Sequence, residues 1–292
     1  MSYVGRFAPS PTGPLHLGSL TTAVASYLHA RQAGGEWLVR VEDIDPLREP
    51  PGAAAEILRT LDAFGLHWDR DVLYQSTRFA EYRAAAQALL DRGIAFRCSC
   101  SRKDVEESSG GGRRYPGICR SRTVHAGATA IRVLVEPGFV GFRDGLQGCV
   151  EADLSAAEGD YVVYRRDDFP AYHLAVVLDD HWQGVDTIVR GADLLTTTLV
   201  HCHLRPLVGL PEPRYFHLPV VSDRRGVKLS KQTGAAPVGV VYSAETAVRV
   251  LELLGLEVPD DGRGAPGAEL WAWALGQWKI EELIGRQSIH IA

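Results

Sequence analysis

Several features that would place a protein in a membrane or outside the cell are missing from this sequence. No run of about eighteen or more apolar residues occurs, so no membrane-spanning helix is expected. The first residues lack a basic segment followed by an apolar one, and we therefore expect no secretion signal and a cytoplasmic location. Cysteine is scarce as well. Five cysteines among 292 residues, in a cytoplasmic chain, argue against a disulfide framework.

Positive charge is also in short supply. Lys and Arg number 31 against 36 Asp and Glu, which gives a net charge of −5. Proteins that hold nucleic acid through many phosphate contacts are usually basic, so the overall charge argues against an RNA partner. Basic clusters nevertheless occur at Arg113-Arg114 with Arg120 and Arg122, at Arg165-Arg166 and at Arg224-Arg225. These clusters keep an RNA partner open.

What the sequence does contain is an alternation of strands and helices. Residues 3–8 and 37–42 have the apolar content of buried strands. Between them, residues 15–33 have the pattern of a helix, which Gly34 and Gly35 would end. A strand, a Gly-Pro loop, a helix and a strand make a βαβ unit, which predicts a parallel sheet and an α/β fold.

Further elements follow along the chain. Helices are predicted at residues 50–64, 78–93, 194–208, 243–254 and 268–284, and a strand at residues 215–221. The α/β pattern is interrupted after residue 93 and resumes with residues 172–178 and 187–190. Residues 94–160 hold three cysteines, a Ser-Ser-Gly-Gly-Gly loop and short strand-like runs, so we expect an inserted subdomain there.

The loop after the first predicted strand has the composition of an anion site. Gly13 and Gly18 allow the backbone to approach a ligand closely. The following helix would direct its free N–H groups and positive dipole end at the loop, where a phosphate is favoured. His16 and Ser19 lie at that point, and a histidine there can donate to a phosphate in a transition state. An ordinary helix cap with a surface histidine is the alternative for His16 alone.

A second loop, Lys228-Leu229-Ser230-Lys231, follows the predicted strand at residues 215–221. Two lysines three residues apart, with a hydroxyl between them, can hold a triphosphate, because lysine is a mobile point charge on a long stem. Taken alone, such a tetrapeptide is more often a solvated basic turn. Its value lies in its pairing with the first loop.

Together the two loops resemble the ATP signatures of class I aminoacyl-tRNA synthetases, in the wording of the glutamyl branch. The resemblance rests on the stretches Arg6–Gly18, Arg40–Asp45, Val189–Leu195 and Lys228–Lys231 and extends from residue 3 to about residue 235. It implies a Rossmann-like catalytic domain that makes an aminoacyl-adenylate from ATP, with Mg²⁺, and releases pyrophosphate. It also implies that His16, Lys228 and Lys231 are catalytic, and that ATP is bound by His16, Gly18, Ser19, Lys228, Ser230 and Lys231.

The amino acid expected from this branch is glutamate. An ammonium and two carboxylates in a dry pocket must each meet an opposite charge, because an unpaired buried charge is costly. Glu42 suits the ammonium, and Arg6 and Arg190 suit the carboxylates, although which arginine takes which carboxylate stays open. Ser10 and Tyr172 can add hydroxyl contacts. All five positions match the glutamate site of the family by motif. Glutaminyl relatives lack an arginine at the position of Arg190, so glutamine should be rejected.

Three cysteines, Cys98, Cys100 and Cys119, suggest a structural zinc site. Tetrahedral Zn²⁺ takes four ligands, so one more is needed. His125 is the generic fourth ligand by sequence distance. Tyr115 stands where the short glutamyl-synthetase-like proteins have a phenolate ligand, and the resemblance therefore favours Tyr115. Three buried reduced cysteines without a metal are the alternative.

The stretch after the second loop, residues 232–292, is short. A full glutamyl-tRNA synthetase has a large helical anticodon-binding region there, so the chain resembles the glutamyl-queuosine tRNA(Asp) synthetases, a truncated branch. This implies transfer of glutamate to the cyclopentenediol of queuosine in the anticodon stem-loop of tRNA(Asp). Candidate contacts to the RNA backbone are Arg113, Arg114, Arg120 and Arg122. A minimal or split glutamyl-tRNA synthetase that charges the 3′ end is the alternative.

The domain organisation follows from the same considerations. Residues 1–93 and 161–235 would form the two halves of the Rossmann-like catalytic domain, residues 94–160 the zinc-bearing insertion, and residues 236–292 a short helical C-terminal region without an anticodon-binding domain. Two other classes remain. A nucleotidylyltransferase would not need Glu42 and Arg190, and a non-catalytic RNA-binding relative would be expected to lack His16 or the loop lysines.

The remaining ionisable residues receive plainer interpretations. Asp43 and Asp45 could help to hold Mg²⁺, but solvated turn carboxylates are the better interpretation. Asp179-Asp180 has the appearance of loop charges, and Cys149 and Cys202 that of core residues.

Overall fold

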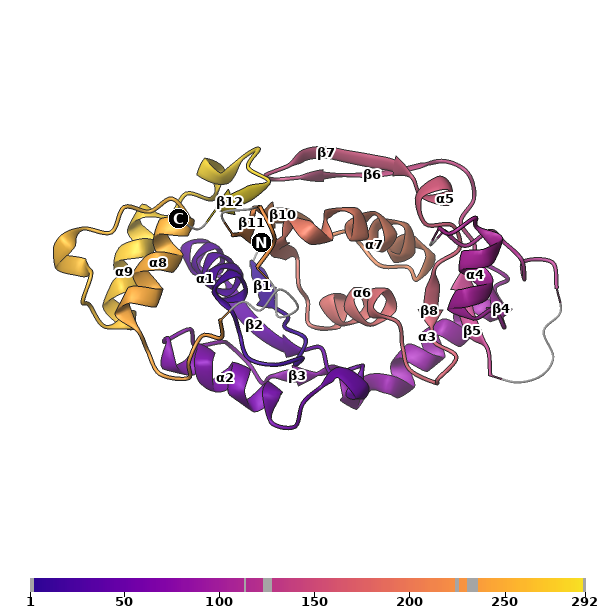
Figure 1. The fold of residues 1–292 in the computed structure, drawn as a ribbon, viewed down its shortest axis with the longest axis horizontal. Coiled ribbons are helices and arrows are strands. Elements are labelled where there is room, and N and C mark those ends of the chain that lie inside the picture. The colour runs from indigo at the N-terminus through magenta and orange to yellow at the C-terminus, as the bar shows by residue number, and fades with distance from the viewer. Residues whose placement is uncertain (1–2, 113, 123–127, 224–225, 230–235, 291–292) are drawn as a thin grey trace.

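The βαβ unit at the start of the chain forms as predicted in the computed structural model (Figure 1). The structure describes residues 3–112, 114–122, 128–223, 226–229 and 236–290. Strand β1 (Val4–Phe7) leads into helix α1 (Leu17–Gln32) and strand β2 (Glu36–Val41). The two strands pair in parallel, with Val4 opposite Glu36, and the short strand β3 (Leu73–Tyr74) extends this sheet beyond β2. The carboxyl end of β1 and the start of α1 therefore lie together.

A second sheet carries the other half of the α/β pattern. Its strand order is β7-β6-β10-β9, with β9 (Thr187–Gly191) and β10 (Arg214–Leu218) in parallel. The N–H of Asp186 donates to the carbonyl oxygen of Val4 at 3.1 Å, which joins this sheet to β1. Residues 172–182 form helix α6 (Tyr172–Trp182), and helix α7 (Leu195–Leu207) follows β9.

The predicted insertion contributes to two sheets. Strands β4 (Ala95–Cys98), β5 (Ala130–Val133) and β8 (Val162–Tyr164) make an antiparallel sheet, with the short helices α4 (Arg102–Ser108) and α5 (Leu154–Ala157) nearby. The hairpin of β6 (Phe139–Asp144) and β7 (Gly148–Asp153) instead joins β10, where Tyr215 lies opposite Asp144. The division at residues 94–160 stays a prediction, and its hairpin belongs to the second sheet.

The remaining helices are α2 (Ala53–Ala63), α3 (Phe79–Asp91), α8 (Ala244–Leu253) and α9 (Gly267–Gln277). All of the predicted helices except α9 agree closely with their predicted ranges. The helix predicted at residues 268–284 ends early because Trp278 takes an extended conformation, and only a short 3-10 turn, Ile280–Leu283, follows. None of the helices in the described ranges is both long and apolar enough to cross a bilayer.

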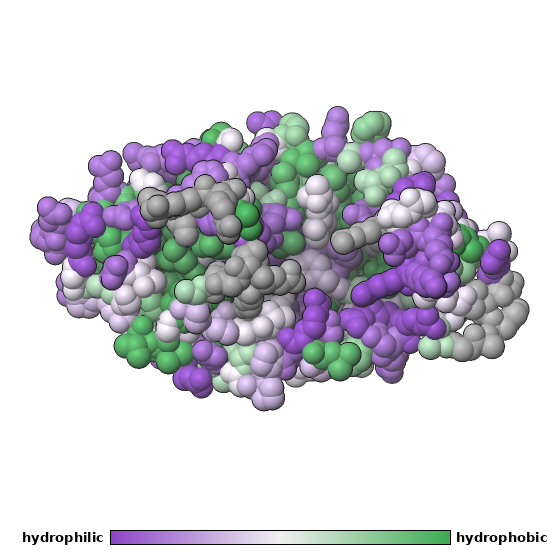
Figure 2. Space-filling view, viewed as in Figure 1, coloured by the Kyte–Doolittle hydropathy of each residue, from purple (hydrophilic) through white to green (hydrophobic). Residues whose placement is uncertain are grey.

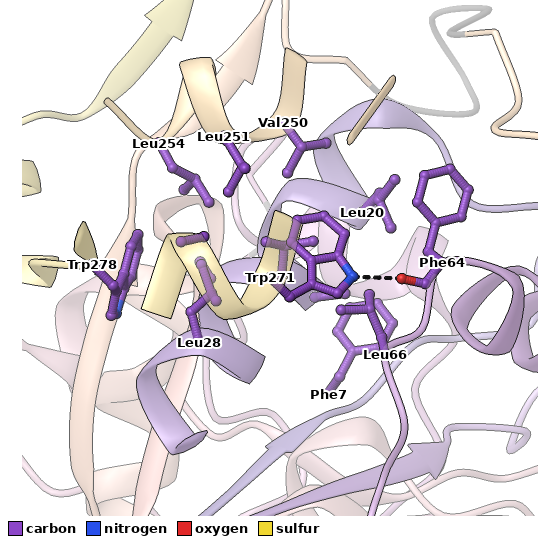
Figure 3. Close-up of a cluster of buried hydrophobic side chains, with 14 of the residues drawn as sticks. Phe7, Leu20, Leu28, Phe64, Leu66, Val250, Leu251, Leu254, Trp271 and Trp278 are labelled. Atoms are coloured by element: carbon purple, nitrogen blue, oxygen red, sulfur yellow. Dashed lines mark hydrogen bonds between the residues drawn. The ribbon is translucent and has the colours of Figure 1, made fainter. Parts of the chain in front are cut away.

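The C-terminal helices pack on the first helix of the chain. Figure 3 shows Leu20 of α1, Leu251 of α8 and Trp271 of α9 in one cluster of buried apolar side chains. The indole N–H of Trp271 donates to the carbonyl oxygen of Phe64 at 2.5 Å. Burial of such side chains contributes about 25 cal/mol per Å² of apolar surface. Residues after 243 are therefore part of the main core.

The end of the described chain returns to the second loop. Strand β11 (Val220–Ser222) pairs in parallel with β12 (Ser288–His290), and Ser222 forms an isolated bridge with Lys228. On the face shown in Figure 2, hydrophilic residues gather over the end of the molecule that carries α4, and apolar residues show only in small groups. Exposed large apolar side chains are scattered, as expected for an ordinary protein surface.

Candidate active site and metal centre

A cavity of about 490 Å³ opens where the first and second loops meet. Its walls include Ser10, His16 and Lys228, together with Gly18 and Ser19. The structure thus brings the two predicted phosphate-binding loops to one cavity, although they are more than two hundred residues apart in the sequence. Ser230 and Lys231 lie outside the described residues.

The first loop ends in a helix cap formed by His16. Its Nδ1 accepts from the N–H of Ser19 at 3.2 Å, and Ser19 Oγ accepts from the N–H of His16 at 2.8 Å. This reciprocal cap fixes the first turn of α1. Gly13 has a φ of +135°, which favours glycine. A Cβ on Gly18 would lie 3.3 Å from the His16 ring, so glycine also allows the tight approach there.

Lys228, which also lines the cavity, forms an ion pair. Its Nζ lies 2.6 Å from Oδ2 of Asp193, and both side chains are partly exposed. The backbone beside it is held by Leu229, whose N–H donates to the carbonyl oxygen of Val221 at 2.9 Å. A partly exposed pair of this kind contributes on the order of 0–1 kcal/mol. A phosphate could therefore replace Asp193 as the partner of Lys228 at little cost.

Four residues of the predicted glutamate site share one buried region. Arg6, Glu42 and Arg190 are 3%, 6% and 4% exposed, and Tyr172 is half-buried. Burial raises the pKa of Tyr172 to about 12, with Glu42 adding to the rise and Arg190 and Arg6 opposing it. The ring centroid of Tyr172 lies 5.7 Å from that of His201, whose Nδ1 is 3.5 Å from Arg190 Nη2. Arg6 and Glu42 are linked through Asp180 and Arg40. Ser10, the fifth predicted residue, is exposed and lines the cavity.

Glu42 lies at the carboxyl end of β2. Its Oε1 is 3.3 Å from Nη2 of Arg40, and the side chain is 6% exposed. Burial raises the pKa of Glu42, and the guanidinium groups of Arg40 and Arg6 oppose that rise without cancelling it. A further cation, such as a substrate ammonium, would favour the ionised form.

Arg6 is held by an acidic residue that the sequence interpretation assigned to a loop. Asp180 lies on α6 and is fully buried. Its Oδ1 is 3.1 Å from Nε of Arg6 and 2.8 Å from Nη1 of Arg40, and its Oδ2 is 3.5 Å from Nη2 of Arg205. Burial raises the pKa of Asp180, but these guanidinium groups lower it by more, so the net pKa lies well below its usual range. The loop interpretation of Asp180 was therefore wrong.

Asp179 corrects the same interpretation. It too is fully buried on α6, and its carboxylate accepts from Gln75 Nε2 at 2.8 Å, Arg78 Nε at 2.8 Å and Tyr82 Oη at 2.5 Å. These partners tie α6 to α3 and to the turn before it. The apolar run Ala175–Leu178 in front of both aspartates was the signal that could have placed them on a buried helix.

Arg190 has neutral partners. Its Nε donates to His217 Nε2 at 3.2 Å and its Nη2 donates to Thr198 Oγ1 at 2.6 Å. Within the described part of the chain, no carboxylate lies within ion-pair distance of Arg190, and its buried Nη1 has no hydrogen-bond partner. Burial, and after it the charge of Arg190, lowers the pKa of His173 to about 4 and that of His201 far below its usual value. Arg190 is thus a buried cation among neutral side chains.

Sequence reasoning did not identify His217, Thr198 or Asp144. His217 Nδ1 lies 2.6 Å from Asp144 Oδ2, and both groups are buried. These residues come from β10, α7 and β6, so no local pattern connects them.

The cysteine cluster is compact. The Sγ atoms of Cys98, Cys100 and Cys119 all lie within 4.8 Å of one another. Tyr115 Oη is 3.4 Å from Cys98 Sγ and 3.9 Å from Cys100 Sγ, and it accepts from the N–H of Cys119 at 2.8 Å. Three thiols and a phenol therefore converge in a way that could hold a metal ion such as zinc. His125 lies outside the described residues.

The predicted RNA contacts are partly engaged within the protein. Arg120 makes a bidentate ion pair with Asp160 at 2.7 and 2.6 Å, and Arg114 Nε donates to the Ser155 carbonyl oxygen at 2.8 Å. Arg122 is exposed. Arg113, Arg224 and Arg225 lie outside the described residues.

The structure also shows the surroundings of the two remaining cysteines and of Asp43 and Asp45. Cys149 is exposed on β7, so its assignment to the core was wrong, whereas Cys202 is buried as predicted. Asp43 accepts from the N–H and the hydroxyl of Ser76, and Asp45 pairs with Arg48, which agrees with their interpretation as turn carboxylates.

Comparison with known proteins identifies the relatives of this chain. A family model described as "tRNA synthetases class I (E and Q), catalytic domain" matches residues 3–257. Glutamyl-Q tRNA(Asp) synthetases of Dechloromonas aromatica and Methylococcus capsulatus are 49% and 48% identical, over 98% and 96% of this chain and 97% and 93% of theirs. A glutamate tRNA ligase of Elizabethkingia meningosepticum, solved with its amino acid, is similar in fold, with a TM-score of 0.83 and 23% identity over 100% of this chain and 67% of that one.

Proposed function

We propose a function from the premise that this chain belongs to the glutamyl-Q tRNA(Asp) synthetase family, within the class I tRNA synthetases for glutamate and glutamine. The protein is a ligase of the aminoacyl-tRNA synthetase type. It activates glutamate with ATP and transfers it to queuosine on tRNA(Asp). The observation that carries the assignment of glutamate is Arg190, a buried guanidinium without a carboxylate partner among the described residues.

The glutamate site consists of Arg6, Ser10, Glu42, Tyr172 and Arg190. A buried cation without a counter-ion is costly, so an anionic ligand gains where a neutral one does not. Arg6 already shares Asp180 with Arg40, whereas Arg190 has no acid beside it. The full charge of Arg190 is therefore available to a carboxylate, and Glu42 is available to the ammonium.

The ATP site consists of His16, Gly18, Ser19 and Lys228, with Ser230 and Lys231 assigned to it by the family resemblance. In the first step an α-carboxylate oxygen of glutamate attacks the α-phosphorus of ATP, the bond to the bridging oxygen breaks, and pyrophosphate leaves. The imidazole of His16 at the start of α1 donates a hydrogen bond to the phosphates, and the loop lysines neutralise their charge. ATP brings Mg²⁺, which adds to that neutralisation. In the second step a hydroxyl of the queuosine cyclopentenediol attacks the acyl carbon, a proton is released and AMP leaves.

Replacing His16 by Asn is expected to lower kcat for adenylate formation by about 10²–10³-fold with little change in KM for glutamate, because the imidazole acts on the phosphates. Asn can still cap α1, whereas Ala would also cost about 1 kcal/mol of stability. Glutamate-dependent exchange of pyrophosphate into ATP measures both constants. His67→Asn, on an exposed side chain, is the matched control. An unchanged kcat for His16→Asn would remove His16 from the phosphate site.

The cysteine cluster is proposed to hold structural zinc through Cys98, Cys100, Cys119 and Tyr115. Four protein ligands leave no open position for catalysis. Metal analysis of the purified protein is expected to give about one Zn²⁺ per chain. Cys119→Ser should lose it and Cys149→Ser, on an exposed cysteine away from the cluster, should keep it. Comparing Tyr115→Phe with His125→Ala identifies the fourth ligand. Full zinc content in Cys119→Ser would contradict the site.

We propose the anticodon stem-loop of tRNA(Asp) as the RNA partner and the cytoplasm as the location of the protein. The relatives carry tRNA(Asp) in their names, and the chain spans nearly their full length. Residues 1–93 and 161–235 are proposed as the catalytic halves and 94–160 as the insertion. Residues 236–292 then complete the core instead of building an anticodon domain.

The deciding experiment maps where glutamate is attached. The protein is incubated with ATP, labelled glutamate and tRNA(Asp) that either contains or lacks queuosine, and the RNA is cleaved into fragments. Label on the anticodon fragment, and only with queuosine present, is expected. Label at the 3′ end, independent of queuosine, would instead establish a minimal glutamyl-tRNA synthetase.

A further inference from the structure

We infer that Asp144 and His217 are positioning residues that determine specificity for glutamate by holding Arg190 in place without neutralising it. The inference rests on the proposed function and deepens it. Three adjacent strands make the arrangement possible. Asp144 ends β6, His217 lies on β10 and Arg190 lies opposite His217 on β9. The row Asp144–His217–Arg190 therefore runs across the sheet to the proposed substrate.

Backbone N–H groups hold the carboxylate of Asp144 in place beside His217. Its Oδ1 accepts from the N–H groups of Leu146 and Gln147, each at 2.9 Å, and the N–H of His217 donates to the same carboxylate at 3.2 Å. Burial raises the pKa of Asp144, but His217 and these N–H donors lower it below its usual value. The carboxylate is thus an ionised acceptor held by the backbone.

An ionised Asp144 sets the tautomer of His217. Asp144 Oδ2 lies 2.6 Å from His217 Nδ1, so that nitrogen carries the proton and donates it. In the neutral ring the lone pair is then on Nε2. That nitrogen accepts from Arg190 Nε at 3.2 Å and lies 2.9 Å from Thr198 Oγ1, whose hydroxyl can also donate to it. The other tautomer would bring two N–H groups together.

A neutral acceptor leaves the charge of Arg190 uncompensated. Asp180 shows the other arrangement, in which a carboxylate touches Arg6 directly. At Arg190 the imidazole of His217 separates the guanidinium from the carboxylate of Asp144. Thr198 Oγ1 is a second neutral acceptor, 2.6 Å from Nη2. The buried Nη1 has no hydrogen-bond partner in the described part of the chain. The guanidinium is thereby held at two nitrogens, with its charge and one nitrogen left for a carboxylate.

A double-mutant cycle tests this arrangement. In Asp144→Asn the amide can donate to Nδ1, which would put the proton on Nε2 against Arg190. We expect KM for glutamate to rise about tenfold or more with a much smaller change in kcat. In His217→Gln the amide oxygen can accept from Arg190 without a tautomer to fix, and KM should stay within about threefold of wild type. Because glutamine at position 217 has no tautomer for Asp144 to fix, the double variant should have the same KM for glutamate as His217→Gln.

The cycle separates positioning from general damage to the fold. Any general loss of stability caused by Asp144→Asn occurs both in the wild type and in His217→Gln, so it cancels when the two effects on KM are compared. Thermal unfolding of each variant measures that loss. If Asp144→Asn does not fold, His217→Leu against His217→Gln carries the test, since only the second keeps an acceptor for Arg190. Additive effects in the cycle, or equal KM values for the Leu and Gln variants, would overturn the inference. Failure of the proposed function is distinct, because the wild-type protein would then show no glutamate-dependent pyrophosphate exchange.

Discussion

Replacing Arg190 by Leu is expected to reduce kcat/KM for glutamate by about 10³-fold, since truncating one partner of a buried charge pair costs roughly 2–5 kcal/mol. The structure gives the reason. No acidic side chain in the described residues compensates Arg190, whereas Arg6 already contacts Asp180, so the loss of Arg190 removes the uncompensated positive charge of the site. Activity with glutamine, whose side chain carries no charge, should fall far less if Arg190 takes the side-chain carboxylate, and the preference for glutamate over glutamine should collapse. Pyrophosphate exchange with each amino acid measures the ratio.

Two further variants sharpen this result. Arg190→Lys keeps a positive charge but loses the planar fork that His217 and Thr198 hold, so it should recover only part of the activity. Arg249→Ala, on a partly exposed arginine of α8, should behave as wild type. A preference for glutamate that survives in Arg190→Leu would mean that another residue selects the side chain.

Replacing Asp180 by Asn is expected to lower the free energy of unfolding by about 3–5 kcal/mol. Asp180 is fully buried and contacts Arg6, Arg40 and Arg205, so its loss leaves several guanidinium groups in a low dielectric with too little negative charge. The pKa of Asp180 is depressed in the folded protein. The stability it contributes is therefore fully present above the carboxyl's unfolded pKa of about 3.9 and is lost as the pH falls below that value.

Urea denaturation at neutral pH and at about pH 3.5 measures both effects. The difference between wild type and Asp180→Asn should be smaller at the acidic pH. Asp168→Asn is the matched control, because Asp168 pairs with Arg83 on the surface and such pairs contribute about 0–1 kcal/mol. Equal stability of Asp180→Asn and Asp168→Asn would show that the buried network contributes little.

The elements that the sequence predicted best are those with a strong local signal. The first βαβ unit needs only the apolar period of residues 3–42 and the glycines that end α1. Cys98, Cys100 and Cys119 could be recognised as a cluster from their residue type and spacing, and their Sγ atoms lie close together in the structure. His16 and Lys228 were paired through a family resemblance, and the two line one cavity.

What local signals could not provide is the arrangement around the arginines. Asp180 and Arg6 are 174 positions apart in the sequence, and His217 and Asp144 are 73 apart. Nothing near Asp180 in the chain states that arginines from three other elements will surround it. Without them a pair of aspartates is better placed in solvent, which is why the loop interpretation failed. Only the strand order, which brings β6, β10 and β9 together, creates the row that ends at Arg190.

The pairing of β12 with β11 has a practical consequence for anyone who handles this protein. Ile289 of β12 lines the same cavity as His16, and its neighbouring strand runs into the loop that carries Lys228. Proteolytic clipping before Ser288 would therefore detach β12 and open one wall of this cavity, so the mass of a preparation should be checked before kinetic work.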